Sequence, residues 1–191
     1  TIEGLPAGFT VDLATLKTFL QRRSPSHPWD TPRKETDDPQ FVSGISAEGI
    51  LDGSPLTAKL PNTNVRPQDY TATKLVPRPG HADFSAWAKW GDLYKQTGGG
   101  HFSARLTAPL CIAGGISLQI LQAQGITIAA HVLKIKNIND TPLELVDNSH
   151  EASRLLAHQM NQLLQAGPQE FPFLDAQAGE KTRALLTQLR S

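Results

Sequence analysis

The sequence has a single cysteine, no excess of either charge and no long apolar run, and each absence excludes a class of protein. Cys111 has no partner for an internal disulfide, which suits a reducing compartment. Eighteen basic residues balance eighteen acidic ones, so no overall field attracts nucleic acid or a membrane surface. The longest apolar stretch, residues 108–121, is too short and too interrupted to span a bilayer. We therefore expect a soluble, cytoplasmic protein that meets any anionic ligand with local charge.

Two further absences concern metal sites and the first residues of the chain. The six histidines show no HExxH motif and no paired Cys/His spacing, so we expect no metal site. No basic-then-apolar signal segment opens the sequence. Residues 1–9 contain two glycines and a proline but no initiating methionine, and they resemble the middle of an element. We expect the chain to be shortened at its start.

The spacing of apolar residues predicts a globular α+β protein. Proline and glycine positions predict loops at 24–39 and 62–81. No repeat or linker divides the sequence, so we predict a single domain over residues 1–191. Helices are predicted for residues 12–23 with Asp12 as N-cap, from about 84, for 103–124 with Gly125 ending it, for 149–166, and from about 179 onward. Short strands are predicted for 41–45, 48–51 and 56–60, as an antiparallel meander, and for 126–135.

The first candidate site is a proline-bounded loop that carries Arg78 and His81. Prolines on both sides of the arginine fix its backbone, and Gly80 allows the chain to approach a ligand closely. A guanidinium offers a planar fork for phosphate or carboxylate, and a histidine can transfer a proton near neutral pH. The alternative is a structural turn without a ligand.

The second candidate site is the glycine-rich segment 98–105, which leads into a predicted helix. Backbone amides at a helix start favour an anion, Ser103 is a candidate cap, and Arg105 lies in the first turn. The spacing fits neither a Walker loop nor a dinucleotide fingerprint. A flexible turn before a helix explains the pattern equally well. On residue chemistry alone the sequence predicts an α+β domain with an anion site, and nothing more specific.

Taken in their order along the chain, these segments resemble the chorismate synthase family. The most specific features are RPGHAD at 78–83 and GGGHFSAR at 98–105, and the similarity covers essentially the whole chain. Shorter matches are EGLPAG at 3–8, RRSP at 22–25, TPRKE at 31–35, SG at 43–44, GSPL at 53–56, NTN at 62–64, QDY at 68–70 and Lys89.

The resemblance implies a lyase of the shikimate pathway, the route of aromatic amino-acid biosynthesis. Such an enzyme eliminates phosphate from 5-enolpyruvylshikimate 3-phosphate to give chorismate and uses reduced FMN without net redox change. The resemblance also implies a homotetramer whose helices pack against antiparallel sheets in a β-α-β sandwich, of which this chain would form about half. Whether the flavin is reduced by a nicotinamide such as NADP or by a separate reductase stays open.

Site residues follow from the same resemblance, position by position. His81 matches the family histidine beside the flavin, which is thought to protonate the reduced cofactor. The arginines match residues that hold the phosphate and carboxylates of the substrate, and the segment after the glycines matches a stretch that contacts flavin. The implied substrate-binding residues are Arg23, Arg78 and Arg105, and the implied cofactor-binding residues are His101, Phe102 and Ser103.

The sequence also departs from the family pattern. Trp29 stands where many members have a further arginine, while Leu106 and His101 replace a glutamate and an arginine, as subgroup variants would. The amino-terminal GESHG segment, with its second catalytic histidine, and the carboxy-terminal half are missing. We therefore expect an amino-terminal half, shortened at both ends and inactive alone. The alternatives are a non-catalytic module that binds an anion or flavin, and a packing module without a ligand.

Overall fold

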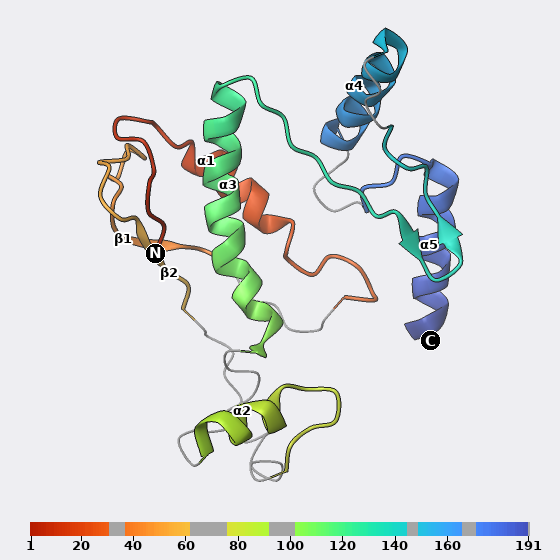
Figure 1. The fold of residues 1–191 in the computed structure, drawn as a ribbon, viewed down its shortest axis with the longest axis horizontal. Helices are drawn as coiled ribbons and strands as arrows, with labels where there is room; N and C mark the ends of the chain where they lie inside the picture. The colour runs from red at the N-terminus through yellow and green to blue at the C-terminus, as the bar shows by residue number, and fades with distance from the viewer. Residues whose placement is uncertain (31–36, 62–75, 92–101, 145–148, 166–170, 191) are drawn as a thin grey trace. The chain divides into compact units, whose positions relative to one another are not determined.

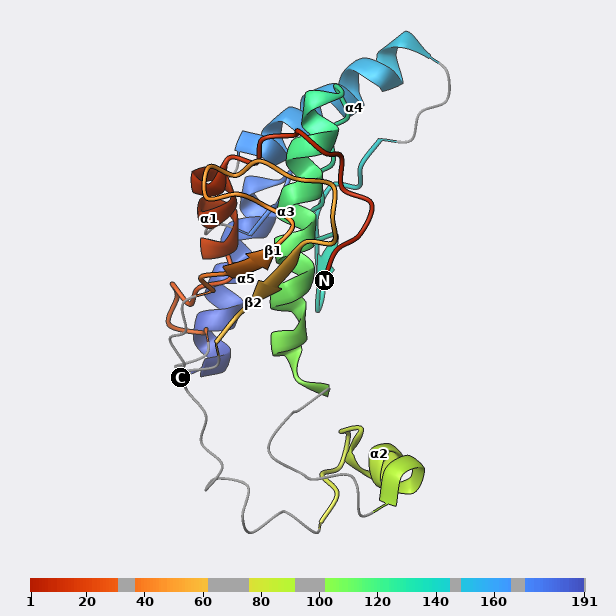
Figure 2. The same ribbon diagram turned by 90° about the vertical axis from the view of Figure 1, so that its left-hand side faces the viewer.

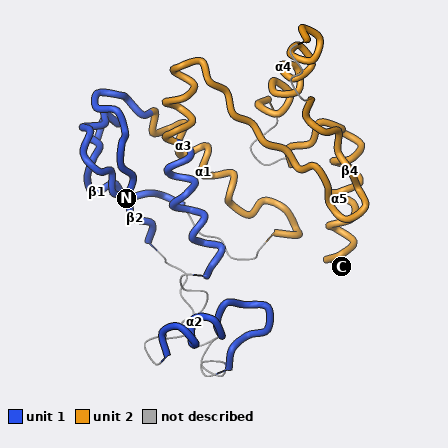
Figure 3. The backbone as a smooth tube through the Cα atoms, viewed as in Figure 1, with its two compact units in different colours: residues 1–11, 35–115 blue, residues 12–34, 116–191 orange. Residues whose placement is uncertain are grey.

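The computed structural model describes residues 1–30, 37–61, 76–91, 102–144, 149–165 and 171–190. These residues contain five α-helices and two small antiparallel sheets, so the predicted α+β class is confirmed (Figure 1). They divide into two compact units, residues 1–11 with 35–115 and residues 12–34 with 116–191 (Figure 3). A single domain over the whole chain stays a prediction, and each unit is taken separately below.

The first unit is built around a short antiparallel sheet. β1 (Gln40–Ser43) pairs with β2 (Thr57–Lys59), and the two strands lie side by side in Figures 1 and 2. The predicted strands at 41–45 and 56–60 are confirmed with shorter bounds and pair with each other, but the predicted strand at 48–51, and with it the three-stranded meander, is wrong. Residues 48–51 take part only in isolated bridges, which join Thr10 to Ile50 and Ile45 to Leu51, and a further isolated bridge joins Ile2 to Leu56.

Leucines on both sides of a tight turn form the centre of this unit. Leu51 and Leu56 are fully buried, and each contributes on the order of 2 kcal/mol through burial of its side chain. Gly44 lies against Leu56 with φ of +85°, a backbone angle that favours glycine. Its missing side chain thus allows two backbone segments to touch. Other buried apolar residues of the unit are Val11, Ala86, Ala108 and Ile112.

A continuous helical run leaves the first unit and enters the second. The short 3₁₀ turn η4 (Ala104–Leu106) leads directly into α3 (Thr107–Ala123). The helix ends as predicted, because the amides of Gly125 and Ile126 donate to the carbonyls of Gln122 and Leu121 at 3.0 and 2.9 Å. This pair of bonds, with positive φ at the glycine, is the Schellman motif.

The run from Ala104 to Ala123 has the length and composition of a membrane span, so the apolar segment is longer than its sequence suggested. Its polar Gln119 is used in packing. The Gln119 side chain accepts from the amide of Asp12 at 2.8 Å and donates to the Asp12 carbonyl at 3.0 Å. This two-way amide contact ties α3 to the backbone of Asp12.

The second unit begins with α1 (Leu13–Gln21), which confirms the predicted first helix and its cap. Asp12 Oδ1 accepts from the amides of Ala14 and Thr15 at 2.9 and 3.1 Å, so the helix starts where the sequence indicated. Leu16 and Leu20 lie on its buried face.

The remaining elements of this unit are two helices and a tiny hairpin. α4 (His150–Gln165) confirms the fourth predicted helix, and α5 (Ala176–Arg190) starts three residues before the predicted 179. β3 (Lys134–Ile135) pairs with β4 (Ile138–Asn139), and α5 contacts β4 (Figure 1). The leucines of α4 are only partly buried, since Leu155 and Leu164 are 44% and 54% exposed while Leu163 is buried.

The predicted strand at 126–135 is wrong for most of its length, because only its last two residues pair in β3. Its β-branched residues favour extended backbone, but a strand also needs a paired strand beside it, and residues 126–133 pair with no strand among the described residues. The amide of Val132 instead donates to the carbonyl of Pro172 at 3.0 Å. Side-chain propensity therefore predicted the conformation but not the pairing.

A buried carboxylate ties this hairpin to the start of α5. Asp140 Oδ2 accepts from His131 Nδ1 and from the amide of Leu174, both at 2.9 Å, and Oδ1 accepts from the amide of Asp175 at 2.8 Å. Burial alone would raise the pKa of the Asp140 carboxyl, but these hydrogen bonds hold the pKa below its usual value of 3.8.

We expect acid to weaken the second unit through Asp140. A carboxyl whose pKa is lowered by folding adds stability above its unfolded value, and this contribution is lost as the pH falls below about 4. Asp140→Asn should lower the free energy of unfolding by about 2 kcal/mol at neutral pH. It should also make the free energy of unfolding depend less on pH in the acid range, as measured by urea unfolding at several pH values. Asp38→Asn, at an exposed position, should stay within about 0.5 kcal/mol of the parent protein at neutral pH. Equal unfolding free energies for the two variants would show that Asp140 does not tie the segments together.

We also expect a large difference between two glycine substitutions in the first unit. A Cβ at Gly44 would lie 2.4 Å from Leu56 Cα, whereas a Cβ at Gly8 meets nothing within 4 Å, although both glycines have positive φ. Gly8→Ala should cost about 1 kcal/mol from backbone strain alone, and Gly44→Ala should cost at least about 2 kcal/mol more from the clash. Thermal unfolding monitored by circular dichroism distinguishes them, and equal losses would refute the close contact.

Candidate functional site

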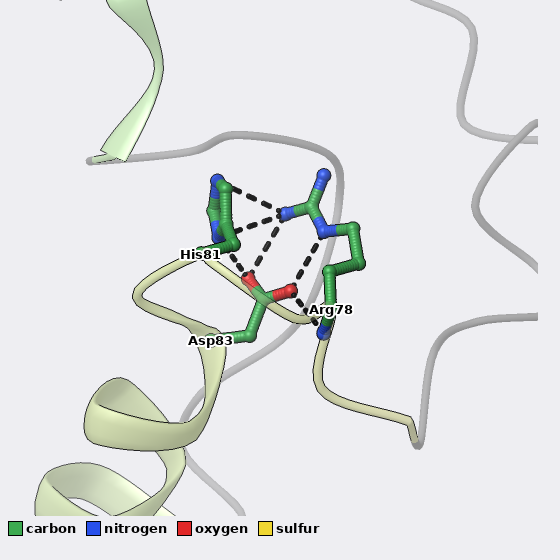
Figure 4. A network of polar contacts seen from close by, with 3 residues as sticks. All are labelled: Arg78, His81 and Asp83. Atoms are coloured by element: carbon green, nitrogen blue, oxygen red, sulfur yellow. Dashed lines mark hydrogen bonds and ion pairs between the residues drawn. The ribbon is translucent and has the colours of Figure 1, made fainter.

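The loop before α2 (Asp83–Trp90) gathers three charged or titratable side chains within six residues (Figure 4). Asp83 Oδ2 accepts from Arg78 Nε at 2.7 Å and from the Arg78 backbone amide at 3.1 Å. Asp83 Oδ1 accepts from Arg78 Nη2 at 2.9 Å and lies 2.7 Å from His81 Nδ1. The guanidinium and the imidazole therefore converge on one carboxylate.

The local sequence explains why these side chains meet. Pro79 and Gly80 form the centre of a turn in which the amide of His81 donates to the carbonyl of Arg78 at 3.2 Å. Gly80 has φ of +72°, and proline followed by a positive-φ glycine is the pattern of a type II turn. The turn reverses the chain, so Arg78 returns over the first turn of α2, where Asp83 lies.

The contact with Asp83 determines which nitrogen of His81 carries a proton. A carboxylate oxygen only accepts hydrogen bonds, so the nearby Nδ1 is protonated and Nε2 is the nitrogen that can exchange a proton with a ligand. Arg78 Nη2 lies 3.2 Å from Nδ1 and 3.3 Å from Nε2 of His81. A guanidinium only donates, so with Nδ1 protonated Arg78 can donate to the ring only at the Nε2 lone pair. A cation and a proton-transfer group are thus held together, an arrangement suited to an anionic ligand.

The segment after the glycines brings Phe102 beside this loop. Its ring meets the His81 ring edge-on, at 6.2 Å between centroids and 89° between planes, and its centroid lies 6.3 Å from the Trp90 ring. Ser103 Oγ accepts from the amide of Arg105 at 3.2 Å, which confirms Ser103 as a cap. The structure therefore joins the RPGHAD loop to the FSAR end of the second motif.

Two of the predicted site residues, Arg23 and His101, are not placed relative to this cluster. Arg23 belongs to the second unit, just after α1, where its amide donates to the carbonyl of Leu20 at 3.1 Å. His101 lies outside the described residues. Asp83, in contrast, stands at the centre of the cluster but was not predicted as a site residue. The signal available for it was an acid two positions after a histidine, at a helix start.

Trp29, which departs from the family pattern, has a packing role in the second unit. Its ring stacks on His27 with centroids 4.7 Å apart, and its carbonyl accepts from Arg190 Nη1 at 3.0 Å. The indole Nε1 is buried and finds no acceptor among the described residues. An aromatic ring at this position therefore stabilises the loop instead of supplying a cation.

The described part of the chain holds no group of three or more His, Cys, Asp or Glu side chains arranged for a metal ion. Its aromatic and cationic groups instead suit an organic anion with a flat ring. Phe102 and Trp90 offer ring faces and edges, and Arg78 and Arg105 offer positive charge within the same unit.

The fold and this loop define an α+β protein with a candidate site that holds an arginine and a histidine on one carboxylate, and comparisons with known proteins specify the family. The sequence model of the chorismate synthase family matches residues 1–191. Because the match covers the whole chain, the chain belongs to the chorismate synthase family.

Individual relatives agree with this assignment. A chorismate synthase of Lancefieldella parvula is 87% identical over 191 residues, which is 100% of this chain and 50% of that protein. A chorismate synthase of Thermococcus kodakarensis is 36% identical over 78% of this chain and 42% of its own length. One of Aeropyrum pernix is 32% identical over 99% of this chain and 46% of its own length. The chain therefore spans about half the length of the curated relatives it matches.

Proposed function

We propose that this chain supplies part of the active site of a chorismate synthase, a lyase of the shikimate pathway. The reaction eliminates phosphate from 5-enolpyruvylshikimate 3-phosphate to give chorismate. The observation that carries the proposal is the family match over the whole chain, combined with the convergence of Arg78 and His81 on one buried carboxylate. The activity is proposed for a protein of the relatives' full length, since this chain spans half of it.

The proposed substrate explains why arginines and a histidine are needed together. The leaving group is a phosphate, and guanidiniums stabilise the negative charge that gathers on it as the carbon–oxygen bond breaks. Arg78 and Arg105, with Arg23 from the second unit, are proposed to hold the phosphate and the carboxylates. His81, with Nδ1 facing Asp83, is proposed to transfer a proton through Nε2.

We further propose FMN as the cofactor. Reduced FMN, when bound, supplies a transient electron that helps to expel the phosphate, and it takes up the hydrogen lost from the ring. Phe102, Ser103 and His101 are the proposed contacts, and the aromatic neighbours of Phe102 support a flat ring at this place. A homotetramer in the cytoplasm and a nicotinamide such as NADP as reductant complete the proposal. The alternative remains a non-catalytic anion- or flavin-binding module.

A titration of FMN tests the proposed activity. In a protein of the relatives' length that contains this chain, FMN absorbance and fluorescence should change most when 5-enolpyruvylshikimate 3-phosphate is present, and an anaerobic assay should detect chorismate. The 191-residue chain alone should give no turnover, because we propose that the site needs more chain. Turnover by the 191 residues would refute that requirement. Flavin binding without turnover in the longer protein would favour the non-catalytic alternative.

His81→Asn tests the proposed proton transfer. The asparagine keeps a polar group of similar reach but cannot exchange a proton near neutral pH, so kcat should fall about 100-fold or more while FMN still binds. The matched control is His158→Asn on the exposed side of α4, which should retain the parent's kcat. Unchanged turnover in the His81 variant would remove this histidine from the mechanism.

A further inference from the structure

The geometry points to Asp83 as a positioning residue that sets the orientation of both Arg78 and His81 and the protonated nitrogen of the imidazole. This inference rests on the proposed function, since it assigns a role within the same site. Asp83 itself need not touch the substrate. Its effect is exerted through the two side chains that it holds.

The burial of Asp83 is the first observation. Its side chain is 2% exposed, whereas those of Arg78 and His81 are 29% and 24% exposed. A carboxylate removed from water is costly unless donors replace the lost hydration. The carboxylate therefore lies behind the two more accessible groups, which is the arrangement of a support and not of a group that contacts ligand.

The donors of Asp83 are the second observation. Three come from Arg78, through its amide, Nε and Nη2, and one comes from His81 Nδ1. Two oxygens that accept from four directions fix the plane of the guanidinium and the rotation of the imidazole together. Without such a partner the long side chain of Arg78 and the imidazole of His81 could adopt several rotamers, so the carboxylate removes much of their conformational freedom.

The backbone at Asp83 is the third observation. Asp83 is the first residue of α2, and the amide of Ala86 donates to the carbonyl of Ala82 at 2.9 Å, so the carboxylate is attached to a regular helical turn. A negative charge at this end also interacts favourably with the helix dipole. The support thus stays in place while the exposed ends of Arg78 and His81 face outward.

The consequence for chemistry concerns Nε2 of His81. When the Nδ1 proton is hydrogen-bonded to Asp83, the neutral ring has its lone pair on Nε2, and the charged ring carries its exchangeable proton on Nε2. Without the carboxylate, neither the ring rotation nor the tautomer would be fixed. The same logic makes the residue that orients a catalytic histidine important in other proton-transfer sites.

The test uses Asp83→Asn in a protein of the relatives' length that contains this chain. An asparagine replaces one of the two carboxylate oxygens with an NH₂ group, which only donates, so it cannot accept at both the Oδ1 and Oδ2 positions and loses part of the contacts with Arg78 and His81. We expect kcat to fall about 10- to 100-fold and the KM for 5-enolpyruvylshikimate 3-phosphate to rise. Asp12→Asn, which changes the N-cap of α1, is the matched control and should leave both constants within about threefold of the parent. Kinetics are expressed per folded molecule.

A double-mutant cycle separates positioning from general support of the fold. Because Asp83 also holds Arg78, adding Asp83→Asn to His81→Asn should still lower kcat, but by a factor at least about threefold smaller than in the parent, since the part exerted through His81 is already lost. If Asp83→Asn lowered kcat by the same factor in both backgrounds, the proposal would be overturned, because the effect of Asp83 would be independent of the histidine. If the Asp83 variant does not fold, the measurement on the parent protein described next still tests the proposal.

Nitrogen-15 spectroscopy of the His81 ring in the parent protein gives a readout that does not depend on activity. The neutral ring should carry its proton on Nδ1, and the proton should shift toward Nε2 in Asp83→Asn. A proton on Nε2 in the parent would refute the positioning role even if the enzyme is active. An inactive parent with the Nδ1 proton in place would refute the proposed function and leave the role of Asp83 as the anchor of the loop.

Discussion

The site of the first unit depends on one buried carboxylate. Asp83 is almost fully removed from water, and an isolated charge in such a place would cost several kcal/mol. The cost is offset only if the chain brings donors to both oxygens. The turn at Pro79 and Gly80 does this, because it returns Arg78 over the start of α2 with its amide and guanidinium aimed at the same group. Loop conformation, helix start and side-chain orientation are therefore consequences of one ion pair.

The sequence predicted the parts of the fold whose causes are local. Asp12 at the start of α1 and Gly125 at the end of α3 act within four or five residues, through hydrogen bonds that their own neighbours complete. The strand predicted for residues 126–135 was wrong for the opposite reason. Its β-branched residues describe an extended chain, but its partners include Pro172, far along the sequence, and no local pattern contains that information.

The same distinction applies to the candidate site. Arg78 and His81 were predicted as neighbours because the motif is only six residues long and its proline and glycine specify a turn. Asp83 was visible in the motif, but its central role requires knowing that it is buried, which depends on packing. Arg23 was assigned through family resemblance alone, since nothing in the sequence relates a residue after α1 to a loop more than fifty positions away. Resemblance thus supplied the function, while local chemistry supplied the geometry of one loop.

Charge within the loop also bears on how much of the site this chain contains. Arg78 and Asp83 cancel each other, so the cluster is neutral when His81 is neutral and carries a single positive charge when the imidazole is protonated. The proposed substrate has a phosphate and two carboxylates, which one such charge cannot balance in a site that excludes water. Arg105 adds a second charge within the first unit. A complete site therefore needs cations from several segments, which accords with a chain that covers about half the length of its relatives.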